Sequence, residues 1–318
     1  MPEWWIERGI GETRAALVDD GEIIEARIDV AGITRAGSVL AARLANMGNN
    51  KHSAVATAED GTEYLLPRGA PGVAQGQSLP IEVTRSAIPG AEAWKRPLAR
   101  VTDQPPQVAE SFSGQELSFP SPDDLLGKTG WDDLIEAART GVVPFAGGEL
   151  RISPTPAMTL IDVDGFLPPD ELAIQGAREA ARAIRRLDIG GSVGIDLPTV
   201  GSKTARQSAA AAIDAVLPQP FERTAVNGFG FVQIVRPRQR GSLVELAQDR
   251  ASFEARALLR RTGFDAPGRK RLVAHPAVIA VIEANSQWLD ALSRQVGGTV
   301  GLRADPALPI SGGYAEQA

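Results

Sequence analysis

The chain has 318 residues and a mass of 33.5 kDa, with 43% hydrophobic and 23% charged residues. It is too long for one small domain and too apolar for a disordered chain. The 39 acidic and 33 basic residues give a net charge of -6, which excludes a surface that is basic throughout. The chain has no cysteine and only two histidines, His52 and His275, which we interpret as surface or capping residues. Disulfides and cysteine zinc sites are therefore excluded, so zinc is not expected and any metal must bind to carboxylates.

No segment approaches the roughly 20 apolar residues that a membrane-spanning helix needs. The N-terminus begins Met1-Pro2-Glu3, not with the basic and then apolar run of a secretory signal. We therefore expect a cytoplasmic protein without a membrane partner.

The basic residues are concentrated in one region. Residues 221–275 contain eleven Lys or Arg against five Asp or Glu, a local net charge of +6. A polyanionic ligand would require such an asymmetry, and a solvated basic helix would produce it too.

The first hundred residues predict β structure. Short strands are expected over 4–8, 13–18 and 22–30, in an N-terminal unit of residues 1–34. Residues 35–103 predict a five-stranded barrel of the OB type, with strands that include 53–57, 62–66, 79–84 and 98–102. Residues 104–130 lack periodicity and are rich in Pro and Ser, which indicates a linker.

From residue 131 the pattern alternates between strands and helices. Residues 131–262 predict an α/β domain with strands at 158–164 and 192–197, separated by a helix over 170–187 and followed by a helix over 202–217. Strands at 223–226 and 229–235 and a helix over 242–261 complete this domain. Residues 263–318 predict a small α+β C-terminal domain with a helix over 276–295, a strand over 299–304 and a loose tail. The expected fold class is therefore α/β, with a parallel βαβ unit as the candidate catalytic domain.

Two strands of the βαβ unit end in carboxylates. Asp162 and Asp164 lie at the end of the first strand, and Asp196 lies at the end of the second. Because ligands bind at the carboxyl ends of parallel strands, these three side chains are expected at one sheet edge, where they could converge. Such a cluster repels itself unless a cation neutralises it, and oxygen ligands alone select Mg²⁺ or Mn²⁺. The alternative is that the acids cap the helices that follow them.

Four motifs in this region resemble, in order and spacing, the catalytic region of the ribonuclease E/G family. They are Leu160-Ile161-Asp162-Val163-Asp164, the helix end Ala181-Arg182-Ala183-Ile184-Arg185-Arg186-Leu187-Asp188-Ile189-Gly190-Gly191, Ile195-Asp196, and the stretch from Gly228-Phe229-Gly230 to Arg236-Pro237-Arg238-Gln239-Arg240. The resemblance implies a Mg²⁺-dependent endoribonuclease that cuts single-stranded RNA and leaves a 5′-phosphate. It makes Asp162 and Asp196 the metal ligands, and Asp164, where the family has Asn, a catalytic residue that orients a water.

RNA contacts are expected on the barrel and among the basic residues that follow Asp196. Where the family has stacking rings on the barrel, this chain has Val55 or Ala56 and Leu65, which leaves Tyr64 as the nearby ring and Arg68 as a lone base. Lys203 and Arg206 are expected to meet phosphate, or else to begin a helix with a solvated face. The remaining RNA-binding candidates are the basic residues Arg223, Arg236, Arg238 and Arg240.

The chain also departs from the family. Only residues 104–130 fill the interval that holds the family's RNase H-like portion and its 5′-monophosphate sensor. The cysteine pair of the family's zinc-linked dimer would fall near residues 264–271, where this chain has none, so that dimer cannot form and the oligomeric state stays open. An alternative function is therefore a non-catalytic RNA-binding or regulatory paralogue.

Overall fold

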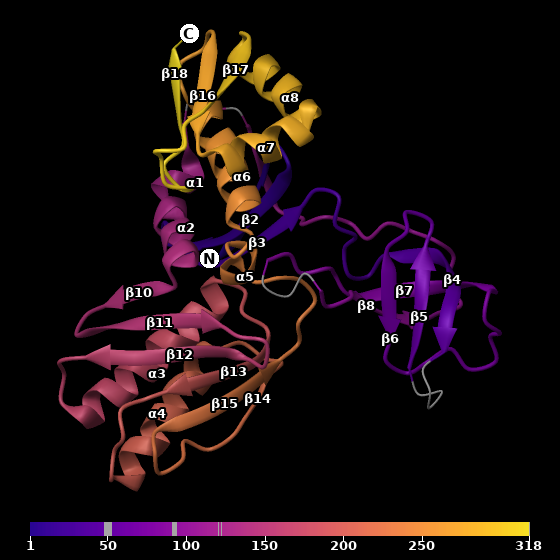
Figure 1. Ribbon diagram of the computed structural model, residues 1–318. Coiled ribbons are helices and arrows are strands. Elements are labelled where there is room, and N and C mark those ends of the chain that lie inside the picture. Colours follow the sequence, from indigo (N-terminus) through magenta and orange to yellow (C-terminus); the bar gives the residue numbers. More distant parts are fainter. Residues whose placement is uncertain (48–52, 91–93, 120, 122, 318) are drawn as a thin grey trace.

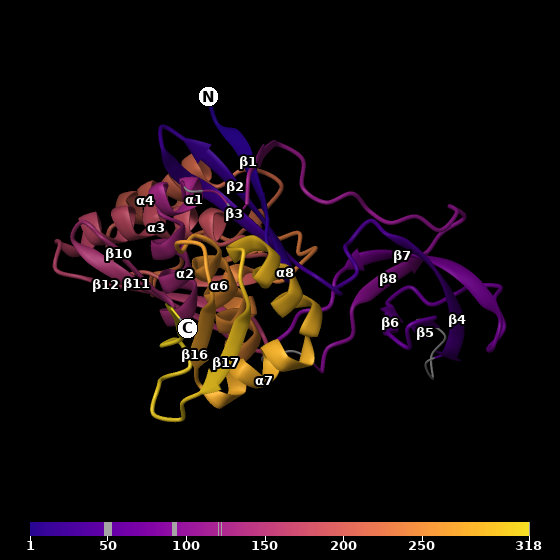
Figure 2. The same cartoon turned by 90° about the horizontal axis from the view of Figure 1, so that it is seen from above.

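The computed structural model describes residues 1–47, 53–90, 94–119, 121 and 123–317 (Figure 1). The described residues form three hydrophobic cores: one in the barrel, one in a C-terminal unit, and one that the N-terminal sheet shares with the α/β domain. The barrel stands to one side of the other two, in both views (Figures 1 and 2). None of the described helices is both long enough and apolar enough to cross a membrane.

The N-terminal sheet has four strands in the order β3-β2-β1-β9. The first three form an antiparallel meander and β9 pairs in parallel with β1. The turn between β2 and β3 uses Asp20 and Gly21, both at positive φ, which is typical of a two-residue hairpin turn with the sequence Asp-Gly. Their bounds are β1 (Glu3–Arg8), β2 (Glu12–Asp19), β3 (Glu22–Val30) and β9 (Gln115–Leu117).

The expected barrel is present as a closed barrel of five strands, in the order β4-β5-β6-β8-β7. Its core contains Leu44, Tyr64, Leu66 and Ile81, which are all at most 1% exposed. The barrel is an insertion in the N-terminal sheet, because its strands lie between β3 and β9 in the chain. The bounds are β4 (Val39–Met47), β5 (Ala54–Ala58), β6 (Glu63–Leu66), β7 (Ser78–Arg85) and β8 (Leu98–Val101).

The segment expected to be a linker is part of the fold. Within residues 104–130, β9 joins the N-terminal sheet, and a short helix, α1 (Leu125–Lys128), is capped by Asp124, whose carboxylate accepts from the Gly127 N–H at 2.7 Å. The Pro- and Ser-rich composition of this segment agrees with its lack of a regular hydrophobic period. The composition could not show that the short strand β9 would pair with β1, more than a hundred residues earlier in the chain.

The α/β domain is built on a mixed sheet of six strands in the order β10-β11-β12-β13-β15-β14. As predicted, β12 and β13 are parallel; the other neighbours are antiparallel. The hairpin of β10 and β11 was not predicted. The bounds are α2 (Trp131–Thr140), β10 (Val142–Phe145), β11 (Gly148–Pro154), β12 (Thr159–Gly165), α3 (Pro169–Arg186), β13 (Gly191–Asp196), α4 (Lys203–Val216), β14 (Glu222–Arg223) and β15 (Phe231–Arg236).

Helices α3 and α4 cover one face of this sheet. The alanine-rich stripe of α3, with Ala177, Ala180 and Ala181 fully buried, allows a close approach to the sheet and to α4. Along β12 the side chains alternate, so that Ile161 and Val163 are buried while Asp162 and its neighbours two residues away are exposed. The face of β12 opposite the helices is therefore open to solvent.

The C-terminal unit packs on the helix formed by residues 250–263. The helix predicted over 242–261 is divided into α5 and α6, and the one over 276–295 is divided at Asn285 into α7 and α8. The tail, expected to be loose, ends in the antiparallel strand β18. His275 caps α7, its Nδ1 accepting from the Ala277 N–H at 3.1 Å, and His52 lies outside the described residues. The bounds are α5 (Leu243–Leu246), α6 (Arg250–Gly263), β16 (Lys270–Ala274), α7 (Pro276–Ala284), α8 (Ser286–Val296), β17 (Val300–Ala304) and β18 (Tyr314–Gln317).

A buried ionic network joins α6 to the N-terminal sheet. Arg14, which is 1% exposed, donates to Glu7 and to Glu12, at 2.6 Å in both cases. Arg256 donates to the Glu12 carboxylate at 2.8 Å, and Arg260 donates to the Glu7 carboxylate at 2.9 Å. Arg260 also donates to both carboxylate oxygens of Asp124, at 2.5 and 2.9 Å.

The network also fixes the protonation state of Glu12. Burial alone would raise the pKa of Glu12, but Arg14 and Arg256 hold that pKa below the ordinary value of 4.5. Ionised Glu12 therefore stabilises the fold above pH 4.5, and this contribution is lost as the pH falls through the lower pKa of the folded state.

We expect Arg260→Ala to lower the free energy of unfolding by about 3–5 kcal/mol, because it leaves the buried Glu7 with Arg14 as its remaining guanidinium partner and removes the ion pair of Asp124. The measurement is urea denaturation followed by circular dichroism. Arg178, an exposed arginine on α3, supplies the control. Arg178→Ala should change stability by less than about 0.5 kcal/mol. Equal stability of the two variants would show that the network does not hold α6 in place.

Candidate active site

The structure brings Asp162 and Asp196 together. They are register partners on the parallel strands β12 and β13, so their side chains leave the same face of the sheet. Neighbouring strands lie roughly 4.8 Å apart. Both side chains are exposed: Asp162 lies in the middle of β12, where the pairing with β13 ends, and Asp196 is the last residue of β13. Neither aspartate caps the helix that follows it, since α3 begins after Pro168 and α4 is capped by Ser202.

An apolar surface borders this pair. Phe231 of β15 is the register partner of Asp196 on its other side, and its ring lies over Gly194. A Cβ at Gly194 would lie 2.6 Å from the Phe231 ring and 3.0 Å from Leu160. Glycine at this position therefore lets Phe231 and Leu160 close over β13 beside the carboxylates.

The two carboxylates repel each other electrostatically. The pKa of Asp162 is raised from its ordinary value of 3.8, first by partial burial and then by the charges of Asp164 and Asp196. Arg151 offsets part of this effect. The ionised form of Asp162 is therefore less favourable in the folded state than in the unfolded chain. A cation bound next to this carboxylate would lower that electrostatic free-energy cost.

Asp164 is on the same face but takes a different position. It lies two residues beyond Asp162 on β12, and Arg151 Nε is 3.9 Å from its carboxylate. Within the described part of the chain, no three or more Asp, Glu or His side chains come close enough to hold one ion. The expected convergence of all three carboxylates on one ion is therefore not found among the described residues, and Asp162 and Asp196 remain as the pair that is in register across neighbouring strands.

The donor set of this pair suits Mg²⁺ or Mn²⁺. It offers carboxylate oxygens at an open edge, and Mg²⁺ commonly binds through one or two carboxylates while it keeps several waters and contacts a substrate phosphate. The pKa of Asp162 is raised first by burial and then by the charges of Asp164 and Asp196, and a bound cation would offset those charges.

Arg151 is a site residue that the sequence analysis missed. It lies on β11, directly across from Asp162 in the register, and it is exposed and paired with Glu149. The alternation of Glu149, Arg151 and Ser153 along β11 could have placed it on the open face. Its partner strand could not be identified from the sequence, because the β10–β11 hairpin was not predicted.

Of the two basic residues after β13, one faces solvent and one stabilises a loop. Lys203 begins α4 and is exposed, with no partner among the described residues. Arg206 instead donates to the carbonyls of Val200 and Gly201, at 2.8 and 3.0 Å. Arg206 therefore shapes the loop that follows Asp196, and Lys203 has an exposed side chain at the first residue of α4.

Three predicted RNA contacts lie at the end of the sheet opposite to Asp196. Arg236 pairs in register with Gly191, five residues before Asp196, which corresponds to about 16 Å along the strand. Its guanidinium donates to the Ile189 carbonyl at 3.0 Å, and burial lowers the pKa of Arg236. Arg238 is paired with Glu245, and Arg240 is paired with Asp188 at 3.2 Å. Because β15 runs antiparallel to β13, the basic stretch is carried away from the carboxylates.

Arg223 is also engaged elsewhere. Its Nε donates to Asp214 on α4 at 2.7 Å, and this hydrogen bond lowers the pKa of Asp214. It lies on β14 at the edge of the sheet, two strands away from β13. Arg223 therefore fastens β14 to α4 and does not face the carboxylates.

The two barrel candidates differ in their exposure. Tyr64 is 1% exposed, and its ring is part of the barrel core, so it cannot stack on an RNA base. Burial raises the pKa of its hydroxyl. Side chains alternate along β6, and the parity that buries Leu66 also buries Tyr64. Arg68 is exposed in the turn after β6, where it borders a cavity of about 470 Å³.

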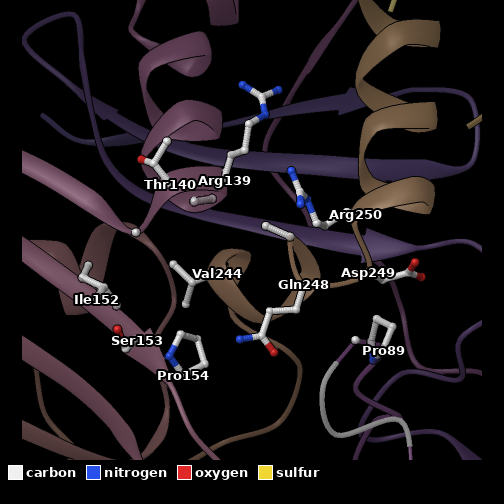
Figure 3. A pocket seen from close by; sticks show the side chains of 14 residues that line it. Pro89, Arg139, Thr140, Ile152, Ser153, Pro154, Val244, Gln248, Asp249 and Arg250 are labelled. Atoms are coloured by element: carbon white, nitrogen blue, oxygen red, sulfur yellow. The ribbon is translucent and has the colours of Figure 1, made fainter. Parts of the chain in front are cut away.

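A larger cavity, of about 1020 Å³, lies away from the carboxylates. Figure 3 shows Arg139 and Arg250 on one side of it and Ile152, Ser153 and Pro154 of β11 on the other. These three residues pair with Ile161, Leu160 and Thr159, the part of β12 that precedes Asp162, so this cavity lies toward the first half of β12. Arg139 is already neutralised by Glu254, to which it donates at 2.6 and 3.0 Å. The cavity lacks the paired carboxylates, and we therefore place the candidate active site at the sheet edge.

Comparison with protein-family models and with curated proteins finds no match to this chain. The resemblance to the ribonuclease E/G family therefore rests on the four sequence motifs. Two of these motifs supply the in-register aspartates, and a third supplies the loop and strand that flank Asp196.

We expect Asp162→Asn to raise the thermal midpoint at pH 7 in EDTA, or to leave it unchanged, because it removes a charge that Asp164 and Asp196 repel. Any gain should vanish as the pH falls through the raised pKa of Asp162, where the wild type is itself protonated. Added Mg²⁺ should raise the midpoint of the wild type but not that of the variant.

Asp290→Asn, at an exposed site on α8, is the matched control and should respond to Mg²⁺ as the wild type does. A loss of about 0.5–2 kcal/mol in Asp162→Asn, equal with and without Mg²⁺, would instead make Asp162 a structural hydrogen-bond acceptor.

Proposed function

We propose that this chain is a Mg²⁺-dependent endoribonuclease of the ribonuclease E/G type that hydrolyses single-stranded RNA in the cytoplasm and leaves 5′-phosphate products. One observation carries the proposal: Asp162 and Asp196 are register partners on adjacent parallel strands at an open sheet edge. This arrangement supports a shared cation, and the raised pKa of Asp162 supports the need for one.

The proposed reaction is the attack of water on a phosphodiester. Asp162 and Asp196 would hold Mg²⁺, which when bound supplies a Lewis acid for a phosphoryl oxygen and helps to activate the water. Water adds to phosphorus as the bond to the 3′-oxygen breaks. The 3′-oxygen takes up a proton and leaves as a hydroxyl, and the downstream fragment keeps the phosphate at its 5′ end.

The residues around the pair have distinct proposed roles. Asp164 would accept a hydrogen bond from the attacking water and orient it. Arg151, across from Asp162, would contact a phosphoryl oxygen and offset the charge of the carboxylates. Lys203, exposed at the start of α4, would contact a flanking phosphate.

We assign the barrel to the OB type and propose that it offers a second, weaker RNA surface. The support is its five-stranded closed topology and the exposed Arg68 beside a cavity. Because Tyr64 is buried, the barrel would contact phosphates more than bases. The main RNA contacts would then lie at the carboxylate edge.

The test is the cleavage of a fluorescent single-stranded RNA oligonucleotide with Mg²⁺ and with EDTA. We expect cleavage only with Mg²⁺, and a loss in rate of about 100-fold or more in Asp162→Asn and in Asp196→Asn, since each removes a proposed metal ligand. Asp290→Asn should keep the wild-type rate. Mass spectrometry of the products should find the phosphate at the 5′ end. Oligonucleotide that is bound but stays intact would favour a non-catalytic RNA-binding or regulatory paralogue.

A second test concerns the phosphate contacts. The logarithm of RNA affinity falls linearly with the logarithm of salt concentration, by about 0.7 for each phosphate that a single strand contacts. Lys203→Ala should reduce this slope by about that amount, because Lys203 is free to meet a phosphate. Arg240→Ala should leave the slope unchanged, because its guanidinium is paired with Asp188. The reverse result would return the RNA path to the basic stretch of β15.

A further inference from the structure

Two phenylalanines are exposed at the sheet edge that carries the aspartates. Phe166 is 86% exposed and Phe229 is 81% exposed. Phe166 follows the end of β12, and Phe229 precedes β15, which lies on the other side of β13. Since β15 runs antiparallel to β13, its first residues lie at the same edge as Asp196. The two rings thus lie on either side of the carboxylate pair.

The loop that presents Phe229 is held by several hydrogen bonds. The Asn227 side-chain oxygen accepts from the N–H groups of Phe229, at 2.9 Å, and of Phe231, at 3.1 Å. The Thr199 hydroxyl donates to the Phe229 carbonyl at 3.1 Å. Gly230 has a φ of +92°, and a Cβ there would lie 2.2 Å from the Leu197 carbonyl oxygen. The ring is therefore exposed on an ordered loop.

Phe166 is exposed by a similar local arrangement. Its N–H donates to the Gly147 carbonyl at 3.1 Å, which ties the end of β12 to the β10–β11 turn. The next residue, Leu167, turns inward, and its side chain packs against Gly147 and the main core. Leu167 thus takes the half-buried position and leaves the Phe166 ring in solvent.

We propose that Phe166 and Phe229 stack on unpaired bases on either side of a phosphodiester that lies over Asp162 and Asp196. This inference deepens the proposed function and rests on it for the position of the phosphodiester. Every base has a π face, so stacking on a phenyl ring is tolerant of sequence. Bases in a duplex are already stacked and paired, so two such rings select a single strand.

The charges between the rings favour nucleic acid over an apolar protein surface as the occupant. Asp162, Asp164, Asp196 and Arg151 lie on the same open face, and an apolar partner would bury them without compensation. A nucleotide strand can place its bases on the rings and leave its charged backbone at the carboxylate edge. There, a cation together with Arg151 and Lys203 would balance its phosphates.

The test measures the binding of a single-stranded RNA oligonucleotide that carries 2-aminopurine, whose fluorescence is quenched when it stacks. Binding is measured with Mg²⁺ in the Asp162→Asn background, so that the proposed cleavage does not interfere. Phe166→Ala and Phe229→Ala should each weaken binding by about 5-fold to 150-fold and reduce the quenching. Phe229→Trp should restore both. Val108→Ala, at another highly exposed apolar residue, should change neither.

An abasic oligonucleotide with the same sugar-phosphate backbone separates stacking from other contacts. Both alanine variants should bind it as tightly as the parent protein does. An equal loss on both oligonucleotides, or no loss on either, would overturn the stacking role. So would variants that only convert a dimer to a monomer in sedimentation, since the rings would then join two copies of the chain.

The same set of proteins separates this inference from the proposed function. If the protein with Asp162 intact binds in a base-dependent way but never cleaves, the nuclease proposal fails and the stacking role stands. If that protein cleaves, and the alanine variants keep its KM and affinity, the nuclease proposal stands and the stacking role fails.

Discussion

The position of the C-terminal unit depends on charges buried between the N-terminal sheet and α6. Arg14 lies at the centre, and Glu7 and Glu12, the two carboxylates around it, each accept from a second guanidinium. Hydrophobic contact would let α6 slide along the sheet, whereas ion pairs at 2.6–2.9 Å require one register. Because Asp124 joins the same network, the segment that returns from the barrel is fixed as well. The network therefore fixes the relative positions of three segments that are far apart in the sequence: the N-terminal strands, the segment at Asp124, and α6.

At the proposed active site, one row of the mixed sheet contains the chemically important side chains. Arg151, Asp162, Asp196 and Phe231 are successive register partners across β11, β12, β13 and β15. The row thus passes from a cation to two anions to an aromatic ring. The helices on the opposite face hold the strands, and no helix has to reach the reacting groups. The loop after β12, the loop after β13 and the loop before β15 all lie at the same end of the sheet, next to this row.

Strands with clear periodicity were predictable, and so was the juxtaposition of their ends. The apolar runs that end in Asp162 and Asp196 identified β12 and β13 to within one residue, because both strands are buried on the helix side. The ion-pair partners of the arginines were not predictable from the sequence. Arg240 finds Asp188, 52 residues away, and sequence spacing carries no information about such a pair. The position of Arg151 beside Asp162 was not predictable either, because it depends on the β10–β11 hairpin, which the sequence analysis did not identify.

The insertion of the barrel affects how the N-terminal sheet can assemble. Pairing of Gln115 with Trp5 closes a loop of more than a hundred residues, and loop closure becomes entropically less favourable as the loop grows. A folded barrel shortens that loop, since Val39 and Gln107 at its base exchange backbone hydrogen bonds at 2.8 and 3.0 Å. Only the short segments on either side of this bridge then remain to be ordered. The route of lowest entropic cost therefore folds the barrel first and docks β9 afterwards, so a barrel that folds slowly would delay completion of a sheet to which it contributes no strand.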